Sequence, residues 1–299
     1  MLKSLPSIEG PKLKPFQRGR DVAIQFQGQV GSGAHSYVWK VSIDGQIYAL
    51  KMFRFTHPIA FARWLQPARL KQRGVTCTAQ RELQQLEPFS CECRAFARLK
   101  EAGEEAVAVG CHGYLLLTRN QEDELARRGL DDWVDRFYED EDNYPVERGP
   151  IRAIVKEYIE DGEPFRRPMV PRMQRDFLAL HRCGIAHRDT WAKKFRGGKV
   201  VDFSTSWTVP HHMLDLAGGD RSPGRIYEHA GLDAIYFDRM IDEWNERHGY
   251  MIWSRITPNV MYYKRLRGWR GRWDTRSLRD MMKVHPADYD WEAPPHTSK

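Results

Sequence analysis

The stretch AHRDTWAKKFRGGKVVDFS (residues 186–204) carries two aspartates, Asp189 and Asp202, each at the end of a predicted element. Asp189 follows a segment whose apolar residues have helical spacing, and Asp202 follows the short apolar run of a predicted strand. Standing alone, each could be an aspartate that caps a turn. Together they suit phosphoryl transfer, in which Asp189 accepts the proton of an attacking hydroxyl and Asp202 holds Mg²⁺.

A glycine-rich turn, GSGAHSYV (31–38), lies earlier in the chain between two predicted strands. Gly31 and Gly33 would let backbone amides approach a phosphate, because a Cβ there would collide with the ligand. The strand YALK (48–51) then ends in Lys51, and a lysine on a stiff element can reach nucleotide phosphates. The turn alone could be a plain hairpin, but with the lysine and the two aspartates it indicates a nucleotide site.

The spacing of apolar residues divides the chain into a strand-rich first half and a mainly helical second half. Alternation predicts three antiparallel strands within about 22–50, with a hairpin at Asp44-Gly45. Helical spacing over 88–101 predicts a helix in this half. Further expected elements are strands at 115–117, 151–158 and 199–203 and helices at about 173–183 and 232–248. The fold class is therefore expected to be α+β.

The composition is that of a folded chain, with 41% hydrophobic and 29% charged residues in a length of 299. This length suits one two-lobed domain or two small ones. No apolar run is long enough for a signal peptide or a membrane span, so we expect no membrane partner. The five cysteines form an odd set without zinc-ligand spacing, which favours reduced thiols in the cytoplasm or nucleus.

The net charge of +7 is unevenly distributed. Acidic residues gather at 131–142, inside a segment (119–150) that we expect to be a weakly ordered loop, as are residues 1–15 and the tail from about 285. Basic residues gather at 264–279 with two interleaved tryptophans. Such a segment could bind nucleic acid or an acidic protein surface. The alternative is a solvated helix face whose tryptophans pack in the core.

The order of these motifs resembles the eukaryotic protein-kinase fold over about residues 21–250. The resemblance implies a bilobal α+β fold, in which a small antiparallel-sheet lobe precedes a mainly helical lobe. Its expected parts are a leader (1–20), an N-lobe (21–158) and a C-lobe (159–299) that ends in a basic extension. The resemblance also implies that ATP and Mg²⁺ bind between the two lobes.

The resemblance further implies a role for each residue of the site. Lys51 would contact the phosphates and pair with Glu92, for which Glu82 is the competing carboxylate. Glu92 is preferred because the apolar residues after it form the expected packing face of a helix. Asp189 would be the catalytic base and Asp202 the metal ligand. The nucleotide would be held by Gly31, Gly33, Val38, Ala49, Lys51 and a hinge of Lys156, Glu157 and Tyr158 that meets adenine through its backbone.

Lys194 departs from the kinase pattern, because active kinases carry at this position the asparagine that ligates the second Mg²⁺. An ammonium cannot ligate a cation and would repel one, although it could neutralise phosphate directly. Ser36 and Ser204 replace two kinase glycines, and the segment after Ser204 lacks an Ala-Pro-Glu element. Lys194 would therefore impair or alter catalysis, which favours a pseudokinase. The alternative is an active ATP-dependent kinase that phosphorylates a hydroxyl of a protein or small molecule.

A narrower resemblance is carried by the segments GPKLKPF (10–16), DGQIYALKMFRF (44–55), PFSCECRAFARLKE (88–101), IRAIVKEYI (151–159) and GGKVVDFSTSWTVPH (197–211). These are similar to a fungal kinase-like family that includes the kinetochore subunit of the Sim4 complex. The resemblance implies a filamentous fungal source, kinetochore or other nuclear protein partners at the centromere, and a location in the nucleus or cytoplasm. A third hypothesis is an interaction module that binds partners or DNA through residues 264–279.

Overall fold

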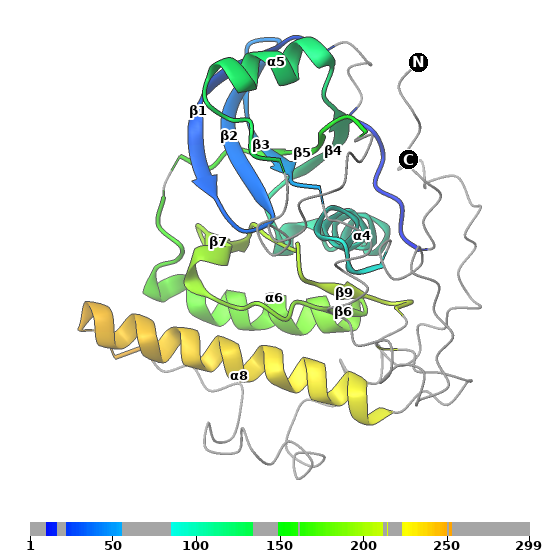
Figure 1. Ribbon diagram of the computed structural model, residues 1–299. Coiled ribbons are helices and arrows are strands. Elements are labelled where there is room, and N and C mark those ends of the chain that lie inside the picture. The colour runs from blue at the N-terminus through cyan, green and yellow to red at the C-terminus, as the bar shows by residue number, and fades with distance from the viewer. Residues whose placement is uncertain are drawn as a thin grey trace.

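An antiparallel sheet of five strands forms one side of the molecule (Figure 1). Its strands are β1 (Ile24–Ser32), β2 (Ser36–Ile43), β3 (Gln46–Phe53), β4 (Cys111–Leu116) and β5 (Arg152–Glu157), in the order β1-β2-β3-β5-β4. The computed structural model describes residues 10–16, 22–55, 85–133, 149–160, 162–211, 214, 223–249 and 251–252. Over these residues, the sheet and the helices confirm the α+β fold class.

The predicted hairpin at Asp44-Gly45 joins β2 to β3. Both turn residues have positive φ, 49° at Asp44 and 78° at Gly45. A two-residue turn of this kind matches the right-handed twist of its strands, and aspartate and glycine are residues that accept it. The hairpin sets the register in which Lys51 pairs with Val38. Lys51 therefore lies beside the glycine-rich turn.

Helix α4 (Pro88–Ala102) lies close to the sheet, below β4 in Figure 1. Pro88 suits the first turn because an N–H at that position would have no acceptor within the helix. Gly103 ends the helix in a left-handed conformation, with φ of 68°. All the side chains from Pro88 to Leu99 are buried, and they include the charged Glu92. The predicted helix over 88–101 is therefore confirmed.

Two helices, α6 (Val170–Arg182) and α8 (Pro223–His248), lie on the side away from the sheet (Figure 1). Phe177 of α6 packs on Phe237 of α8 with ring centroids 5.3 Å apart. The helix expected over about 173–183 is confirmed at its end, where Gly184 follows α6 with φ of 73°. No helix of the described residues is long and apolar enough to cross a membrane. Short elements complete this side: η1 (Glu105–Val107), η3 (Arg167–Met169), β6 (Ile185–Ala186), η4 (Ala192–Lys194), β7 (Phe195–Arg196), β8 (Lys199–Val200) and β9 (Trp207–Thr208).

The expectation of a loop over 119–150 is wrong at its start, where helix α5 (Arg119–Arg127) forms. A capping box begins this helix: the Thr118 side chain accepts a hydrogen bond from the Gln121 N–H, and the Gln121 side chain accepts one from the Thr118 N–H. Leu125 is fully buried and anchors the helix on the sheet. Residues 134–148, which hold most of the acidic run, lie outside the described residues.

The expectation of weak order over 1–15 is wrong for residues 10–15, which together with Phe16 form a segment whose end pairs with β4. The Phe16 N–H donates to the Tyr114 carbonyl (2.8 Å), and the Tyr114 N–H donates to the Lys14 carbonyl (3.2 Å). Gly113 permits this approach, because a Cβ there would lie 2.7 Å from the Lys14 oxygen. We call residues 10–16 the edge strap, since β4 is an outer strand of the sheet.

The predicted strand over 199–203 is shorter than expected. Only Lys199–Val200 (β8) pairs in a ladder, because the partner strand β7 is itself only two residues long. The N–H of Val201 instead donates to the carbonyl of Lys194 at 2.9 Å. This bond brings Asp202 next to the turn that carries Lys194.

The apolar core is divided between the two faces of the sheet. Ile154 of β5 belongs to the cluster that includes side chains of α4, α6 and α8, whereas its neighbour Val155 belongs to the cluster that includes Leu125 of α5. Successive residues of a strand point to opposite faces, which explains this division. The sheet is therefore packed on both faces, and its position relative to α4 and α6 is fixed by the first cluster.

Candidate functional site

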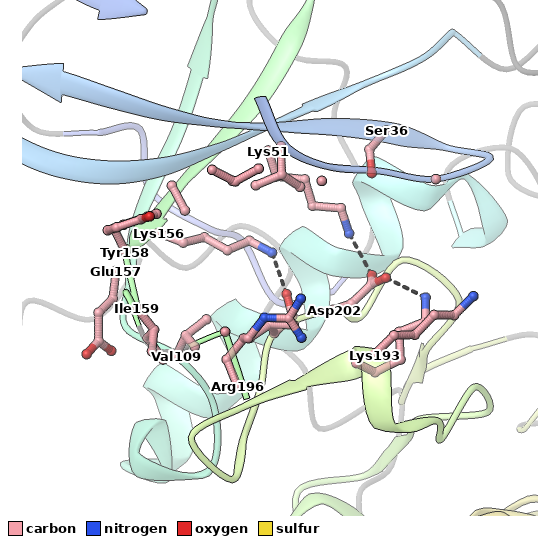
Figure 2. A pocket seen from close by; sticks show the side chains of 18 of the residues that line it. Ser36, Lys51, Val109, Lys156, Glu157, Tyr158, Ile159, Lys193, Arg196 and Asp202 are labelled. Atoms are coloured by element: carbon pink, nitrogen blue, oxygen red, sulfur yellow. Dashed lines mark hydrogen bonds and ion pairs between the residues drawn. The ribbon is translucent and has the colours of Figure 1, made fainter. Parts of the chain in front are cut away.

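A pocket of about 390 Å³ lies between the sheet and the segment that carries Asp202 (Figure 2). This volume falls within the range that small-molecule sites occupy. The sheet side consists of the β1–β2 turn, β3 and the end of β5, and the other side consists of η4, β7 and Asp202. Every residue predicted to hold a nucleotide lines the pocket: Gly31, Gly33, Val38, Ala49, Lys51, Lys156, Glu157 and Tyr158.

The two glycines of the β1–β2 turn are not required by the packing of the chain. A Cβ on Gly31 would meet only Val38, at an ordinary 3.7 Å, and one on Gly33 would meet no atom within 4 Å. Neither glycine has the positive φ that disfavours other residues. The room above this turn is therefore open to a ligand.

Lys51 and Glu92 form a buried ion pair between β3 and α4. The Nζ atom of Lys51 lies 2.5 Å from Glu92 Oε2 and 2.6 Å from Asp202 Oδ1. The pairing of Lys51 with Glu92 implied by the kinase resemblance is thus present, and Glu82 lies outside the described residues. Two charges inside a protein stabilise each other only when their geometry is good and their remaining hydrogen bonds are made.

Two arginines fix the position of α4 and therefore of Glu92. Arg94 donates to the carbonyl of Thr208 at 2.8 Å and to that of Pro210, and Arg98 donates to the carbonyls of Cys183 (3.0 Å) and Val209 (2.7 Å). Both side chains are buried. Charge-assisted bonds of this kind are stronger than bonds between neutral groups. The helix is therefore held against the segment that follows Asp202.

Lys156 is a site residue whose role sequence reasoning missed. The kinase resemblance implies a hinge role for its backbone, but Lys156 lies within β5. Its buried Nζ contacts Glu92 Oε1 and the Val201 carbonyl (2.8 Å). Burial lowers the pKa of Lys156, although the nearby Glu92 opposes this shift. The available signal was a lysine that ends the apolar run Ala153–Val155 of a buried strand.

The other expected hinge residues are also held by the protein. The N–H of Glu157 donates to the Gly110 carbonyl at 2.7 Å. Its carboxylate accepts from the Gly110 N–H (2.9 Å) and from Lys199 Nζ (3.1 Å), and the first of these bonds chiefly lowers the pKa of Glu157. Tyr158 is the first residue after β5. A ligand that bonds to backbone groups outside the strand would therefore have to use Tyr158 or later residues.

Lys194 bridges the two aspartates of the opening stretch. Its Nζ lies 2.8 Å from Asp189 Oδ2 and 2.5 Å from Asp202 Oδ2. Burial disfavours its charge, but Asp202 and Asp189 outweigh burial and raise the pKa of Lys194. Burial likewise opposes the charge of Asp202, yet Lys51 and Lys194 hold its pKa well below the usual range. Both groups are therefore charged at neutral pH.

Asp233 on α8 positions the segment that carries Asp189, and nothing in the sequence indicated it. Its carboxylate is fully buried and accepts from the N–H groups of His187 (2.7 Å) and Arg188 (2.6 Å) and pairs with His181 Nε2 at 3.1 Å. These bonds hold Arg188 at a φ of 69°, which is rare for a residue other than glycine. The imidazole of His187 also contacts the Asp202 carbonyl at 2.9 Å.

The donor atoms around Asp202 do not suit a metal ion. Its Oδ1 accepts from Lys51 and from the Ser204 N–H (2.9 Å), and its Oδ2 accepts from Lys194. A divalent cation on either oxygen would adjoin an ammonium group. Within the described residues, no group of three or more His, Cys, Asp or Glu side chains could hold a metal ion. A nucleotide fits better, because the pocket has an open glycine turn and cationic side chains.

Comparisons with known proteins gave a solved-structure match and a family-model match. A solved structure that matches, the crystal structure of the BubR1 kinase domain, is 14% identical with a TM-score of 0.31 over 66% of this chain and 51% of that one. The chain thus spans about half the length of that kinase-domain chain. No match was found among curated proteins. A family model described as kinetochore Sim4 complex subunit FTA2 matches residues 1–207, which is more than half of the sequence. The chain therefore belongs to the FTA2 family of kinetochore Sim4 complex subunits.

Proposed function

We propose that this FTA2-family protein is a kinase-like kinetochore subunit that binds a nucleotide and has weak or no phosphotransfer activity. The observation that carries the proposal is the composition of one pocket. It combines the open glycine turn, Lys51 and the end of β5. In protein kinases, the corresponding parts cover the phosphates and pair the β3 lysine with a helix glutamate. Here Glu92 pairs with Lys51 in the same way.

The bilobal arrangement belongs to this proposal. In this proposal, the sheet with α4 and α5 belongs to an N-lobe of residues 21–158, and the described residues from 159 onward belong to the C-lobe. Two features support this division: the pocket lies where the two parts meet, and α4 contacts both of them. The nucleotide would lie with its base near Tyr158 and its phosphates near Lys51.

Weak transfer follows from the bridge that Lys194 makes. A catalytic base needs an oxygen within hydrogen-bond reach of the substrate hydroxyl. One oxygen of Asp189 is already bonded to Lys194, and both oxygens of Asp202 are bonded to cationic groups. The site thus resembles an anion-binding cleft more than a metal-assisted transferase. We therefore favour a pseudokinase.

An active kinase is the second candidate, and the geometry around Lys51 favours it. Phosphoryl transfer depends mainly on positioning and electrostatic stabilisation, and Lys51 already contacts both Glu92 and Asp202. Incubation with radiolabelled ATP and a panel of peptides and small hydroxyl compounds separates the candidates. Transfer that is abolished in Asp189→Asn and in Asp202→Asn would establish the active kinase and overturn the pseudokinase proposal.

The partners and the location also belong to the proposal. The family is described as a subunit of the kinetochore Sim4 complex. We propose that this chain assembles with other kinetochore proteins in the nucleus. The basic segment 264–279, with its alternative roles in nucleic-acid binding or packing, lies outside the described residues and stays a prediction.

Nucleotide binding is tested by blocking the pocket without disturbing its charges. Ala49 lines the pocket, whereas Ile47, two residues earlier on β3, does not and is partly exposed. We expect isothermal titration calorimetry to show ATP binding to the wild type and to Ile47→Phe, and little or none to Ala49→Phe. Residues two apart on a strand point to the same face of the sheet. Ile47→Phe and Ala49→Phe therefore both place a phenylalanine on the same face of β3. Equal binding by both variants would place the nucleotide elsewhere.

A further inference from the structure

We propose that the pocket binds its nucleotide without a divalent cation, because the Lys194 ammonium occupies the position between Asp189 and Asp202 that a metal ion would need. The inference rests on the nucleotide site proposed above and specifies the form of its ligand. The ligand would be a free nucleoside di- or triphosphate rather than its magnesium complex. The arrangement of charges around Asp202 leads to this inference in three steps.

The first step concerns the ligand atoms that a metal ion would use. Asp202 accepts hydrogen bonds on both oxygens, from Lys51 at 2.6 Å and from Lys194 at 2.5 Å. Mg²⁺ binds oxygen ligands at about 2.1 Å in a nearly ideal octahedron. A cation at that distance from either oxygen would replace an ammonium group or lie against it. Asp189, the other acidic group, is held by the same ammonium at 2.8 Å.

The second step concerns the charge of the ion-pair network around Asp202. Three ammonium groups and three carboxylates face one another: Lys51, Lys156 and Lys194 against Glu92, Asp189 and Asp202. The network is therefore neutral before any ligand enters. Asp189 and Asp202, the carboxylates that a divalent cation would need as ligands, are therefore already neutralised by ammonium groups.

The third step concerns how phosphate groups would be held. An ammonium has three N–H donors, and Lys51 and Lys194 each use two of them on carboxylates. Each therefore keeps one donor, and both side chains line the pocket. Lys193 and Arg196 also line it, and neither forms an ion pair with any residue that the structure describes. Figure 2 shows both on the side opposite the sheet. Lys51 and Lys194 can therefore each donate one hydrogen bond to a phosphate oxygen, and Lys193 and Arg196 add positive charge that no described carboxylate neutralises.

The experiment measures ATP affinity by calorimetry in EDTA and in excess MgCl₂, on the full-length wild type. We expect binding in EDTA at least as tight as in MgCl₂. Lys194→Asn removes the bridge and supplies a neutral oxygen ligand beside two carboxylates. In this variant, we expect Mg²⁺ to tighten ATP binding about tenfold, which corresponds to about 1.4 kcal/mol. Lys193→Asn is the matched control, which should weaken binding in both buffers and leave their ratio unchanged.

The outcomes separate this inference from the proposed function. Binding of the wild type that requires Mg²⁺ would overturn the inference and leave the nucleotide site intact. Binding in neither buffer would overturn the nucleotide site and the inference with it. An unchanged ratio in Lys194→Asn would show that Lys194 is not the group that replaces the metal. The comparison of wild-type ATP affinity in EDTA and in MgCl₂ needs no variant. It therefore tests the inference even if circular dichroism shows Lys194→Asn to be unfolded.

Discussion

The two sides of the pocket use lysines in opposite ways. On the sheet side, Lys51 and Lys156 share one carboxylate, Glu92, so cations outnumber acids. On the other side, a single ammonium, Lys194, lies between two carboxylates. Burial accordingly dominates at Lys156 and lowers its pKa, whereas the two aspartates dominate at Lys194 and raise its pKa. The sheet side therefore presents positive charge to a ligand. On the other side, Lys194 neutralises the two carboxylates that would otherwise attract a metal ion.

The largest expected effect comes from removing the shared acid of the sheet side. Glu92→Ala leaves Lys51 and Lys156 without the carboxylate that neutralises both. Loss of one partner of a buried ion pair costs about 3–5 kcal/mol of unfolding free energy, and urea unfolding measures it. Glu101→Ala, at an exposed position of the same helix, serves as the control and should cost under about 1 kcal/mol. Equal costs for the two variants would show that Glu92 does not hold the sheet side together.

The second prediction uses pH to compare the two sides of the Lys194 bridge. The lowered pKa of Asp202 contributes stability that is complete above its unfolded value of about 3.9 and is lost as pH falls through the folded value. The raised pKa of Lys194 contributes stability that is complete below about 10.4 and is lost as pH rises through the folded value. We therefore expect Asp202→Asn to flatten the acid limb of the stability profile and Lys194→Met to flatten the alkaline limb.

Urea unfolding across the pH range measures both limbs. Lys193→Met is the control, because Lys193 is exposed and adjoins Lys194 in sequence. It should leave both limbs as they are in the wild type. If Lys193→Met flattened the alkaline limb as strongly as Lys194→Met, the bridge would not be the source of the pH dependence.

The smallest expected effect on stability comes from the β1–β2 turn, which we propose contacts the nucleotide and which the packing of the fold does not require. Gly33→Ala places a methyl group where no atom lies within 4 Å, on a backbone without positive φ. We expect a change in unfolding free energy within about 0.5 kcal/mol, together with weaker ATP binding. Thermal unfolding and calorimetry measure the two quantities. A large loss of stability with unchanged ATP binding would assign the turn to the fold alone.

Local signals made much of the fold predictable. The hairpin at Asp44-Gly45, the helix over 88–101 and the stop after α6 all depend on residues within a few positions of one another. The acidic composition of 119–150 led to a wrong expectation for α5, although Thr118 and Gln121 had the spacing of a capping interaction. The capping box and the burial of Leu125 against the sheet stabilise this helix despite the acidic composition of the segment.

The sequence predicted those site residues whose roles follow from a sequence motif, and it missed those whose roles depend on contacts with distant parts of the chain. Lys51 and Asp202 were predicted from motif order and Glu92 from the kinase resemblance, and the structure brings the three together. The side-chain role of Lys156 and the contribution of Asp233 were not found, because each depends on contacts with residues far away in sequence. The position of Lys194 was noted, but its contacts with both aspartates required the fold of η4 and β8.

The edge strap has a consequence for how the protein can associate with others. An outer strand with unpaired backbone groups invites a strand from another chain. Here Lys14 and Phe16 already bond to Tyr114 of β4, and they are tethered to the same chain. A tethered segment competes at an effective concentration that reaches the millimolar range for short flexible links. A partner strand would therefore have to outcompete the protein's own N-terminal segment for β4, whereas no such competitor is seen along β1 in the described residues.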